Sequence, residues 1–139
     1  MTPKQMSALH KRAFSNTRNW STAEFESLIQ MPTTILTQSE FGFACGQIIA
    51  PDCDLLTIAI DPEVQGKGHG KFLLAKFLGE IALRGARRCL LEVDADNQRL
   101  VRFYHAAGFQ EINRLAGYYT RSDGSKSDAC IMERRLSSE

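Results

Sequence analysis

A stretch from Ile58 to Lys71 constrains the fold of this chain more than any other. It runs from an apolar segment through an Asp-Pro turn and a glycine-rich bend into an amphipathic helix. A helix N-terminus leaves backbone N–H groups unpaired and carries partial positive charge. Gly66, Gly68 and Gly70 let the backbone approach a ligand without a Cβ in the way. The stretch therefore predicts a strand–loop–helix unit that binds a phosphate. An ordinary tight turn between strand and helix is the alternative.

Two common phosphate motifs do not fit this loop. A Walker A loop needs four residues between its glycines and then Gly-Lys-Ser/Thr. Gly66 and Gly70 enclose only three residues, and Phe72 stands where the magnesium-binding hydroxyl belongs. The dinucleotide fingerprint needs Gly-x-Gly-x-x-Gly, whereas this loop reads Gly-x-Gly-x-Gly. Neither motif therefore describes this loop, and a third pattern, given below, does fit it.

Capping signals and hydrophobic periodicity predict a mixed α/β domain with helices and strands around a central sheet. Thr2-Pro3 and the Ser21–Glu24 capping box each start a helix. The second of these helices should bury Phe25, Leu28 and Ile29. Gly42 and Gly46 are candidate bulges, and the strand from Asp54 to Ile60 is apolar on both faces, as in a central strand. Helices are expected over residues 3–14, 22–30, 69–84 and 97–107, and strands over 33–38, 41–50, 54–60, 88–94, 109–119 and 126–136.

Composition limits the classes of function. The chain has 139 residues, 43% hydrophobic and 24% charged, with a formal net charge of +1. These values predict one globular domain over residues 1–139 and give no electrostatic case for nucleic acid or a membrane surface. No apolar run approaches the roughly 18 residues of a membrane span, and Met-Thr-Pro-Lys-Gln lacks a signal-peptide core. We expect a cytoplasmic protein that is a monomer or a weak dimer.

The four cysteines predict core packing in a reducing compartment. Cys45, Cys53, Cys89 and Cys130 form no Cys-x-x-Cys pair and fit no zinc spacing. Three of them fall in expected strands, where a free cysteine behaves as a small apolar residue. Cys45 and Cys53 could face each other across a hairpin, although a disulfide is disfavoured in the cytoplasm. No metal is expected.

Three polar residues, one in the strand expected over 88–94 and two in the helix expected after it, are candidates for chemistry. Glu92 lies in an otherwise apolar strand, where a carboxylate must be paired or solvated in a cleft. It is either a partner of Arg88 or Arg99 in an ion pair or a general base at the sheet edge where open α/β folds place ligands. Asn97 fits a helix N-cap. Tyr104 fits the core, and its hydroxyl could also protonate a leaving thiolate.

The motifs together resemble one family. Gln65-Gly66-Lys67-Gly68-His69-Gly70 matches Gln/Arg-x-x-Gly-x-Gly/Ala, and Leu91-Glu92-Val93, Asn97, Tyr104 and Gly108-Phe109 follow at matching spacing. This pattern is similar to the core of the GNAT N-acetyltransferases, which bind acetyl-CoA. Gly117-Tyr118-Tyr119-Thr120, Asp128-Ala129-Cys130-Ile131-Met132 and the upstream Trp20-Ser21 resemble the RimI-type members, which acetylate the N-terminal alanine of a small-subunit ribosomal protein. The resemblance covers about residues 20–136.

The resemblance implies a role for each matching residue. Ile58, Ala59 and Ile60 would offer backbone groups to the acetyl and pantetheine parts, at a bulge that splays two parallel strands. Glu92 would be the general base, Tyr104 the general acid, and Asn97 a CoA contact. The acceptor groove would be lined by Trp20, Tyr118 and Tyr119. The pyrophosphate would be bound by Gln65, Gly66, Lys67, Gly68, His69, Gly70 and Lys71.

Two departures and two alternatives accompany this assignment. GNAT domains usually begin with a strand, whereas this chain begins almost at once with a helix, so the first strand is expected to be missing or shortened. Arg18-Asn19 also replaces the residues usual before Trp-Ser. The acceptor could therefore be a protein N-terminus, a small amine or a lysine side chain. A CoA-binding module without catalysis is the third possibility.

Overall fold

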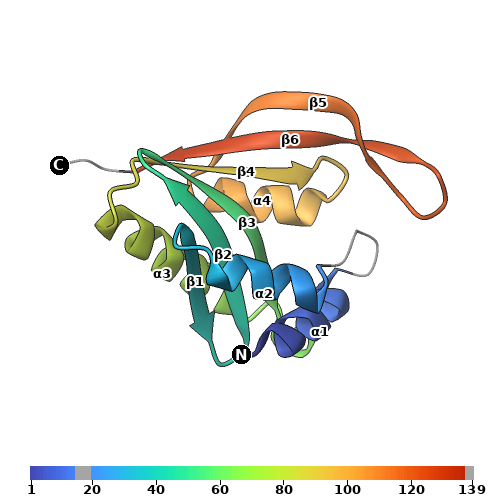
Figure 1. Ribbon diagram of the computed structural model, residues 1–139. Helices are drawn as coiled ribbons and strands as arrows, with labels where there is room; N and C mark the ends of the chain where they lie inside the picture. Colours follow the sequence, from blue (N-terminus) through green and yellow to red (C-terminus); the bar gives the residue numbers. More distant parts are fainter. Residues whose placement is uncertain (15–19, 137–139) are drawn as a thin grey trace.

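The computed structural model describes residues 1–14 and 20–136, and Figure 1 shows their arrangement around a twisted sheet. The strands follow the order β1-β2-β3-β4-β6-β5. None of the helices in the described ranges combines the length and hydropathy needed to span a bilayer. The elements are α1 (Pro3–Ala13), α2 (Thr22–Gln30), β1 (Thr34–Ser39), β2 (Gly42–Ile49), β3 (Asp52–Ile60), the 3-10 turn η1 (Pro62–Val64), α3 (His69–Leu83), β4 (Arg88–Asp94), α4 (Gln98–Ala106), β5 (Gln110–Thr120) and β6 (Lys126–Arg135).

Both N-terminal helices begin where their capping residues predict. The Thr2 hydroxyl accepts from the Gln5 N–H at 3.1 Å, and the Gln5 side chain accepts from the Thr2 N–H at 2.8 Å. Ser21 and Glu24 exchange the equivalent bonds at 3.0 and 3.1 Å. Each reciprocal pair satisfies two N–H groups that the helix itself cannot. Within the described residues the first strand, β1, follows these two helices and forms one edge of the sheet.

Helices cover both faces of the sheet, as the apolar β3 predicted. On one face, α1 and α2 bury a cluster that includes Met6, Phe25 and Phe43. On the other, α3 and α4 pack over the larger cluster that includes Phe77. The expected burial of Ile29 is wrong, because it lies on the outer side of the short helix α2 with 41% of its surface exposed.

Strands β3 and β4 diverge, and this opens the centre of the sheet. Among the described residues they pair in parallel only from Asp52–Asp54 to Arg88–Leu90. Opposite the diverging part, the β2–β3 register shifts between Cys45 and Gly46. The irregularity falls where a bulge was predicted at Gly46, but the extra residue is Leu56 on the partner strand β3. The bulge predicted at Gly42 is wrong, because that residue stays in regular register with Ile60. It is glycine because a Cβ would collide with the Ala59 carbonyl oxygen.

The C-terminal hairpin reaches beyond its neighbouring strand. Pairing of β4 with β6 ends at Asp94 opposite Ala129, while β5 and β6 remain paired to Thr120 opposite Lys126. Figure 1 shows this ribbon extending past β4. The end of the hairpin therefore stands free of the sheet on the side where β3 and β4 separate.

The cysteines are core residues, and Cys45 and Cys53 do not face each other across the hairpin, which the sequence had left possible. All four are free and buried. Cys45 lies opposite Thr57 rather than Cys53, because the β2–β3 turn sets a different register. Burial raises the pKa of Cys45 to about 11, and burial together with Asp54 raises that of Cys53 to about 12. These thiols are therefore protonated at neutral pH.

Candidate active site

The glycine loop between β3 and α3 is held in shape by bonds at its base. Asp61 caps η1 by accepting from the Glu63 N–H at 3.0 Å, and it receives the Arg12 guanidinium at 2.8 Å. The Gln65 amide donates to the Ile60 carbonyl at 3.1 Å. These contacts fix the point at which the chain leaves β3 and turns toward the start of α3.

The start of α3 leaves its backbone N–H groups available to a ligand. Gly68 is the N-cap, with φ of 87°, and it has no side chain to cap the helix. Gly66 has φ of 84°, and a Cβ added at either glycine would meet nothing within 4 Å. The left-handed backbone, and not crowding, therefore favours glycine at both positions, since a Cβ there would not collide with the protein. Without a Cβ, the space in front of the loop stays open.

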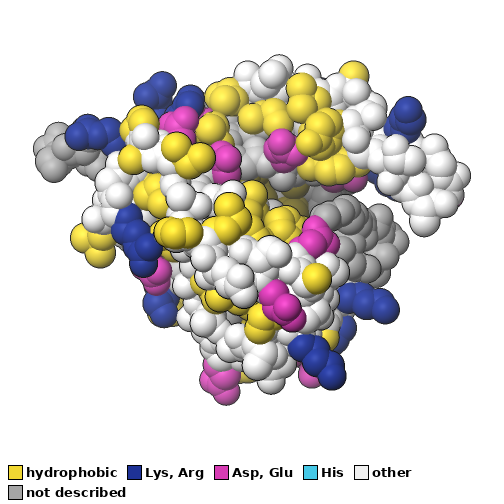
Figure 2. Space-filling view, in the orientation of Figure 1, with side chains coloured by type: hydrophobic (Ala, Val, Ile, Leu, Met, Phe, Trp, Pro, Cys, Tyr) yellow, Lys and Arg dark blue, Asp and Glu magenta, His cyan; other side chains and the backbone are white. Residues whose placement is uncertain are grey.

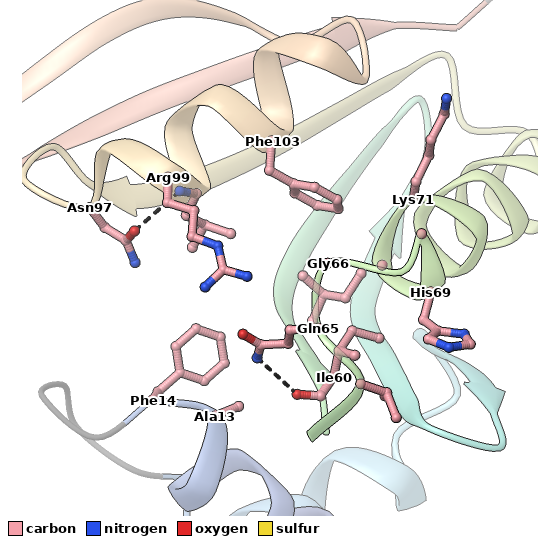
Figure 3. Close-up of a pocket in the computed structure, with 15 residues that line it drawn as sticks. Ala13, Phe14, Ile60, Gln65, Gly66, His69, Lys71, Asn97, Arg99 and Phe103 are labelled. Carbon is pink, nitrogen blue, oxygen red and sulfur yellow. Dashed lines mark hydrogen bonds between the residues drawn. The ribbon is translucent and has the colours of Figure 1, made fainter. Parts of the chain in front are cut away.

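This space is a pocket of about 430 Å³ between the glycine loop, α1 and α4 (Figure 3). Of the predicted phosphate-loop residues, all but Lys67 line it, and of the predicted β3 residues, Ile58 and Ile60 do. Ala59 instead packs in the core under α1 and α2. The pocket is lined by Ala13, Phe14, Ile58, Ile60, Val64, Gln65, Gly66, Gly68, His69, Gly70, Lys71, Asn97, Arg99, Leu100 and Phe103.

A second hollow, of about 810 Å³, lies where β3 and β4 separate. We call it the groove. Figure 2 looks onto it: it runs between the β4–β6 ribbon and α2, with hydrophobic side chains inside and Asp and Glu side chains beside it. Its lining includes the predicted Glu92, Asn97, Tyr104, Trp20, Tyr118 and Tyr119. The pocket and the groove share Phe14, Ile58, Asn97 and Leu100, so they meet at the opening between the two strands.

Glu92 presents its carboxylate to the groove. Its neighbours Leu91 and Val93 are buried, and Glu92 is exposed, as alternation along a strand requires. The ion pair considered with Arg88 does not form, because that guanidinium binds Asp52 and Glu133 at 2.8 and 2.9 Å. A hydrogen bond to Glu92 raises the pKa of the Tyr118 phenol. Glu92 is thus a groove residue with a phenol beside it.

Tyr104 is both a core residue and a groove residue. Its ring packs against those of Phe103 and Phe109, with centroids 5.3 and 5.6 Å apart. Burial raises its pKa, with smaller contributions from Cys89 and Tyr119. The phenol is therefore neutral at physiological pH and can donate its proton into the groove that it lines.

Asn97 joins the two hollows. Its side-chain oxygen accepts from the Leu100 N–H at 3.1 Å and caps α4, and its own N–H donates to the Asp94 carbonyl at 2.9 Å. The cap predicted from sequence is confirmed. Because the residue lines both the pocket and the groove, the remaining side-chain amide stands near their junction.

Aromatic side chains form the walls of the groove. Trp20 stacks on Phe25 with ring centroids 5.6 Å apart, and Tyr118 meets Tyr119 edge to face at 5.1 Å. Burial, followed by the charge of Glu92, raises the pKa of Tyr119 to about 12. The two walls come from opposite ends of the chain, the α1–α2 connection and the free end of the β5–β6 hairpin.

A family comparison agrees with this geometry. The model of the acetyltransferase (GNAT) family matches residues 6–109. The chain belongs to the GNAT acetyltransferase family. The [ribosomal protein bS18]-alanine N-acetyltransferase of Escherichia coli K12 is 36% identical over 91 residues, which are 66% of this chain and 61% of that protein. The chain thus matches less than two thirds of the length of that curated relative.

Solved structures extend the likeness along the whole chain. The crystal structure of the ribosomal-protein-S18-alanine N-acetyltransferase from Escherichia coli has a TM-score of 0.87 and 30% identity, covering 99% of this chain and 89% of that one. The PaiA N-acetyltransferase from Thermoplasma acidophilum, solved in complex with coenzyme A, has a TM-score of 0.67 and 25% identity, covering 84% and 72%. The GNAT fold predicted from the resemblance of the sequence motifs is confirmed.

Several residues of this GNAT site were not predicted from the sequence, in which Arg99 was only a possible ion-pair partner of Glu92. Phe14 follows the last residue of α1, and Arg99 lies on α4 with its guanidinium directed toward the pocket in Figure 3. Leu100 and Phe103 have helical spacing that predicts only core packing. Helix spacing from Asn97 could have placed Arg99 near the loop, but the approach of Phe14 depends on how α1 packs across β3.

Proposed function

We propose that this chain transfers the acetyl group of acetyl-CoA to the N-terminal α-amine of a protein, in the manner of the ribosomal-protein-alanine N-acetyltransferases that it resembles. The observation that carries the proposal is the meeting of the pocket and the groove at the opening between β3 and β4, with Glu92 and Tyr104 both in the groove. A donor in the pocket and an acceptor in the groove would come together at this opening. The sequence and structural likeness to RimI-type enzymes supports the choice of acceptor.

The pocket suits coenzyme A. The pyrophosphate would lie against the N-terminus of α3, where Gly66 and Gly68 leave space and the first-turn N–H groups face it. Arg99, directed toward the pocket, would add positive charge. The pantetheine arm would follow the β3 edge at Ile58 and Ile60, which among the described residues is not paired with β4. Asn97 would contact this arm where the pocket opens into the groove.

The transfer needs a neutral amine. An α-amine has a pKa of about 7.8 and a lysine about 10.4, so deprotonation at pH 7 costs roughly 1 and 4.6 kcal/mol respectively. Glu92, exposed in the groove, would take this proton directly or through a water. The neutral amine nitrogen then adds to the thioester carbon, which gives a tetrahedral oxyanion. This intermediate collapses as the carbon–sulfur bond breaks, and the nitrogen releases its second proton to water in the groove. A backbone N–H at the free β3 edge would stabilise the oxyanion.

The leaving thiolate needs a proton at the end of the reaction. Tyr104 suits this role because burial raises its pKa, so that the phenol holds its proton at neutral pH. The phenolate that results would regain a proton from solvent through the groove. The transfer needs no covalent enzyme intermediate, and the buried, protonated cysteines fit that scheme.

Locating the acetyl group on a product tests the proposal directly. A peptide with a free N-terminal alanine and one internal lysine would be incubated with the chain and acetyl-CoA, and fragmentation mass spectrometry would place the modification. Acetylation of the α-amine is the expected result. Acetyl groups confined to the lysine, or none above the rate without protein, would contradict it.

A further inference from the structure

The wall of the groove formed by Tyr118 and Tyr119 stands on a part of the hairpin that the sheet does not support. Tyr118 lies within a register shift of β5 between Leu115 and Tyr119, and Tyr119 is where pairing with β6 resumes; Gly117, inside the shift, has φ of 61°. A bulge of this kind redirects the side chains that follow it. A two-stranded ribbon without neighbours is only marginally stable in water. The hydrogen bond between Tyr118 and Glu92 joins one of the two tyrosines to β4, and further contacts are needed to fix the end of the hairpin beyond it.

One guanidinium makes that connection. Arg121, the residue after β5, donates to the Asp96 carboxylate at 2.6 Å and lies 3.6 Å from the Asp94 carboxylate. Its backbone N–H donates to the Ser125 carbonyl at 2.8 Å, so the tip of the hairpin is closed by the same residue. Hydrogen bonding to Asp96 raises the pKa of Arg121, and the group stays charged.

The acidic partners belong to the part of the chain that carries the reaction. Asp94 ends β4 two residues after Glu92, and its carboxylate accepts from the Asp96 N–H at 2.9 Å. The Ala95 N–H donates to the Asp128 carbonyl at 2.8 Å, and the Asp128 side chain accepts from Gly117 at 3.0 Å. The turn between β4 and α4 is therefore tied both to the hairpin tip and to the bulge.

Among these contacts, that of Arg121 matters most because its positive charge offsets the repulsion between nearby carboxylates. Without it, the carboxylates of Asp94 and Asp96 would lie close together and near Glu92, with no guanidinium to offset their repulsion. The Asp94 side chain is only 15% exposed, so solvent screens it poorly. Removing the cation therefore favours movement of the hairpin tip away from β4.

We propose that Arg121 is a positioning residue that holds the Tyr118–Tyr119 wall against the β4–α4 turn and so sets the width of the groove for its acceptor. The inference rests on the proposed function, because it assigns the acceptor to the groove. The inference also predicts different effects on the binding of the two substrates. Arg121 does not line the pocket that we assign to coenzyme A.

The test is the variant Arg121→Gln, with Arg135→Gln as a matched control. Arg135 lies on the same hairpin, 79% exposed, and pairs with Glu133 at 3.5 Å far from the groove. Arg121→Gln should raise the KM for an alanine-start peptide roughly five- to ten-fold, the size expected when a partly exposed charge-assisted contact is lost. The KM for acetyl-CoA should not change, and Arg135→Gln should match the unaltered chain in both.

Two further measurements separate positioning from general stability. The exchanged pair Arg121→Asp with Asp96→Arg should recover part of the lost peptide KM. Amide hydrogen exchange should quicken over residues 117–126 in Arg121→Gln and stay unchanged in β1–β3. An unchanged peptide KM, or equal increases in both KM values, would overturn the role of Arg121. Lack of turnover by the unaltered chain would instead refute the proposed function. The role of Arg121 in positioning the acceptor groove would then be refuted as well.

Discussion

Replacing Gly68 by alanine should separate the binding of coenzyme A from the stability of the fold. At φ of 87° a Cβ is strained, yet nothing in the protein lies within 4 Å of it. The strained left-handed backbone lowers the free energy of unfolding, while alanine reduces the entropy of the unfolded chain and offsets part of this loss. The net loss in unfolding free energy should be about 1 kcal/mol. The same Cβ stands where the pyrophosphate would approach. Loss of hydrogen bonds to a charged group weakens binding by about 1.5–3 kcal/mol, or roughly 10- to 150-fold in Kd.

Gly85 supplies a matched control at the other end of the same helix. It also has a positive φ, of 96°, and open space around its Cβ position, but it lies outside the pocket. Thermal unfolding should show a similar fall in Tm of a few degrees for Gly68→Ala and Gly85→Ala. Calorimetric titration with CoA should then show weaker binding for Gly68→Ala alone. Equal CoA affinity in the two folded variants would refute the assignment of the glycine loop.

Three other expectations concern the groove and the core. Glu92→Gln should lower kcat roughly 100-fold while the Kd for CoA stays within about two-fold. The exposed residue Glu26 supplies the control variant, Glu26→Gln. A large loss of CoA affinity in Glu92→Gln would show that Glu92 has a structural role instead. Tyr104→Phe should lower kcat by a similar factor, and an unchanged kcat in this variant would count against the acid role. Because burial raises the pKa of Tyr104, ionisation of the phenol should not lower the native rate up to about pH 10. Iodoacetamide at about pH 8 should leave Cys45 and Cys89 unmodified until the protein unfolds, since burial raises their pKa values to about 11 and 12; rapid alkylation of the native protein would contradict this.

Local signals in the sequence predicted the elements that depend on neighbouring residues. The Thr2-Pro3 signal and the Ser21–Glu24 capping box placed the starts of α1 and α2, and the mostly apolar run from Arg88 to Asp94 matches the bounds of β4. The order of strand, glycine loop and helix predicted the pocket, because the shape of such a loop is set by its own backbone. The family was recognisable for the same reason, since its motifs are local.

Contacts between distant parts of the chain were not predictable in this way. From the sequence, Arg88 was a possible ion-pair partner of Glu92. In the structure, the register of β4 and β6 places Arg88 beside Asp52 and Glu133 instead. The contact of Arg121 with Asp94 and Asp96 depends on how far the hairpin overhangs β4, which no spacing encodes. The exposure of Ile29 depends on which side of α2 meets the sheet, and a nine-residue helix gives too few turns to decide.

Acceptor preference tests the central claim most directly. Thiol release from acetyl-CoA would be measured at equal concentrations of three acceptors: a peptide with a free N-terminal alanine, its N-terminally blocked twin with one internal lysine, and a polyamine. The account predicts turnover on the free-alanine peptide well above the other two. Turnover confined to the blocked lysine peptide or the polyamine would contradict the assignment of a protein N-terminus to the groove.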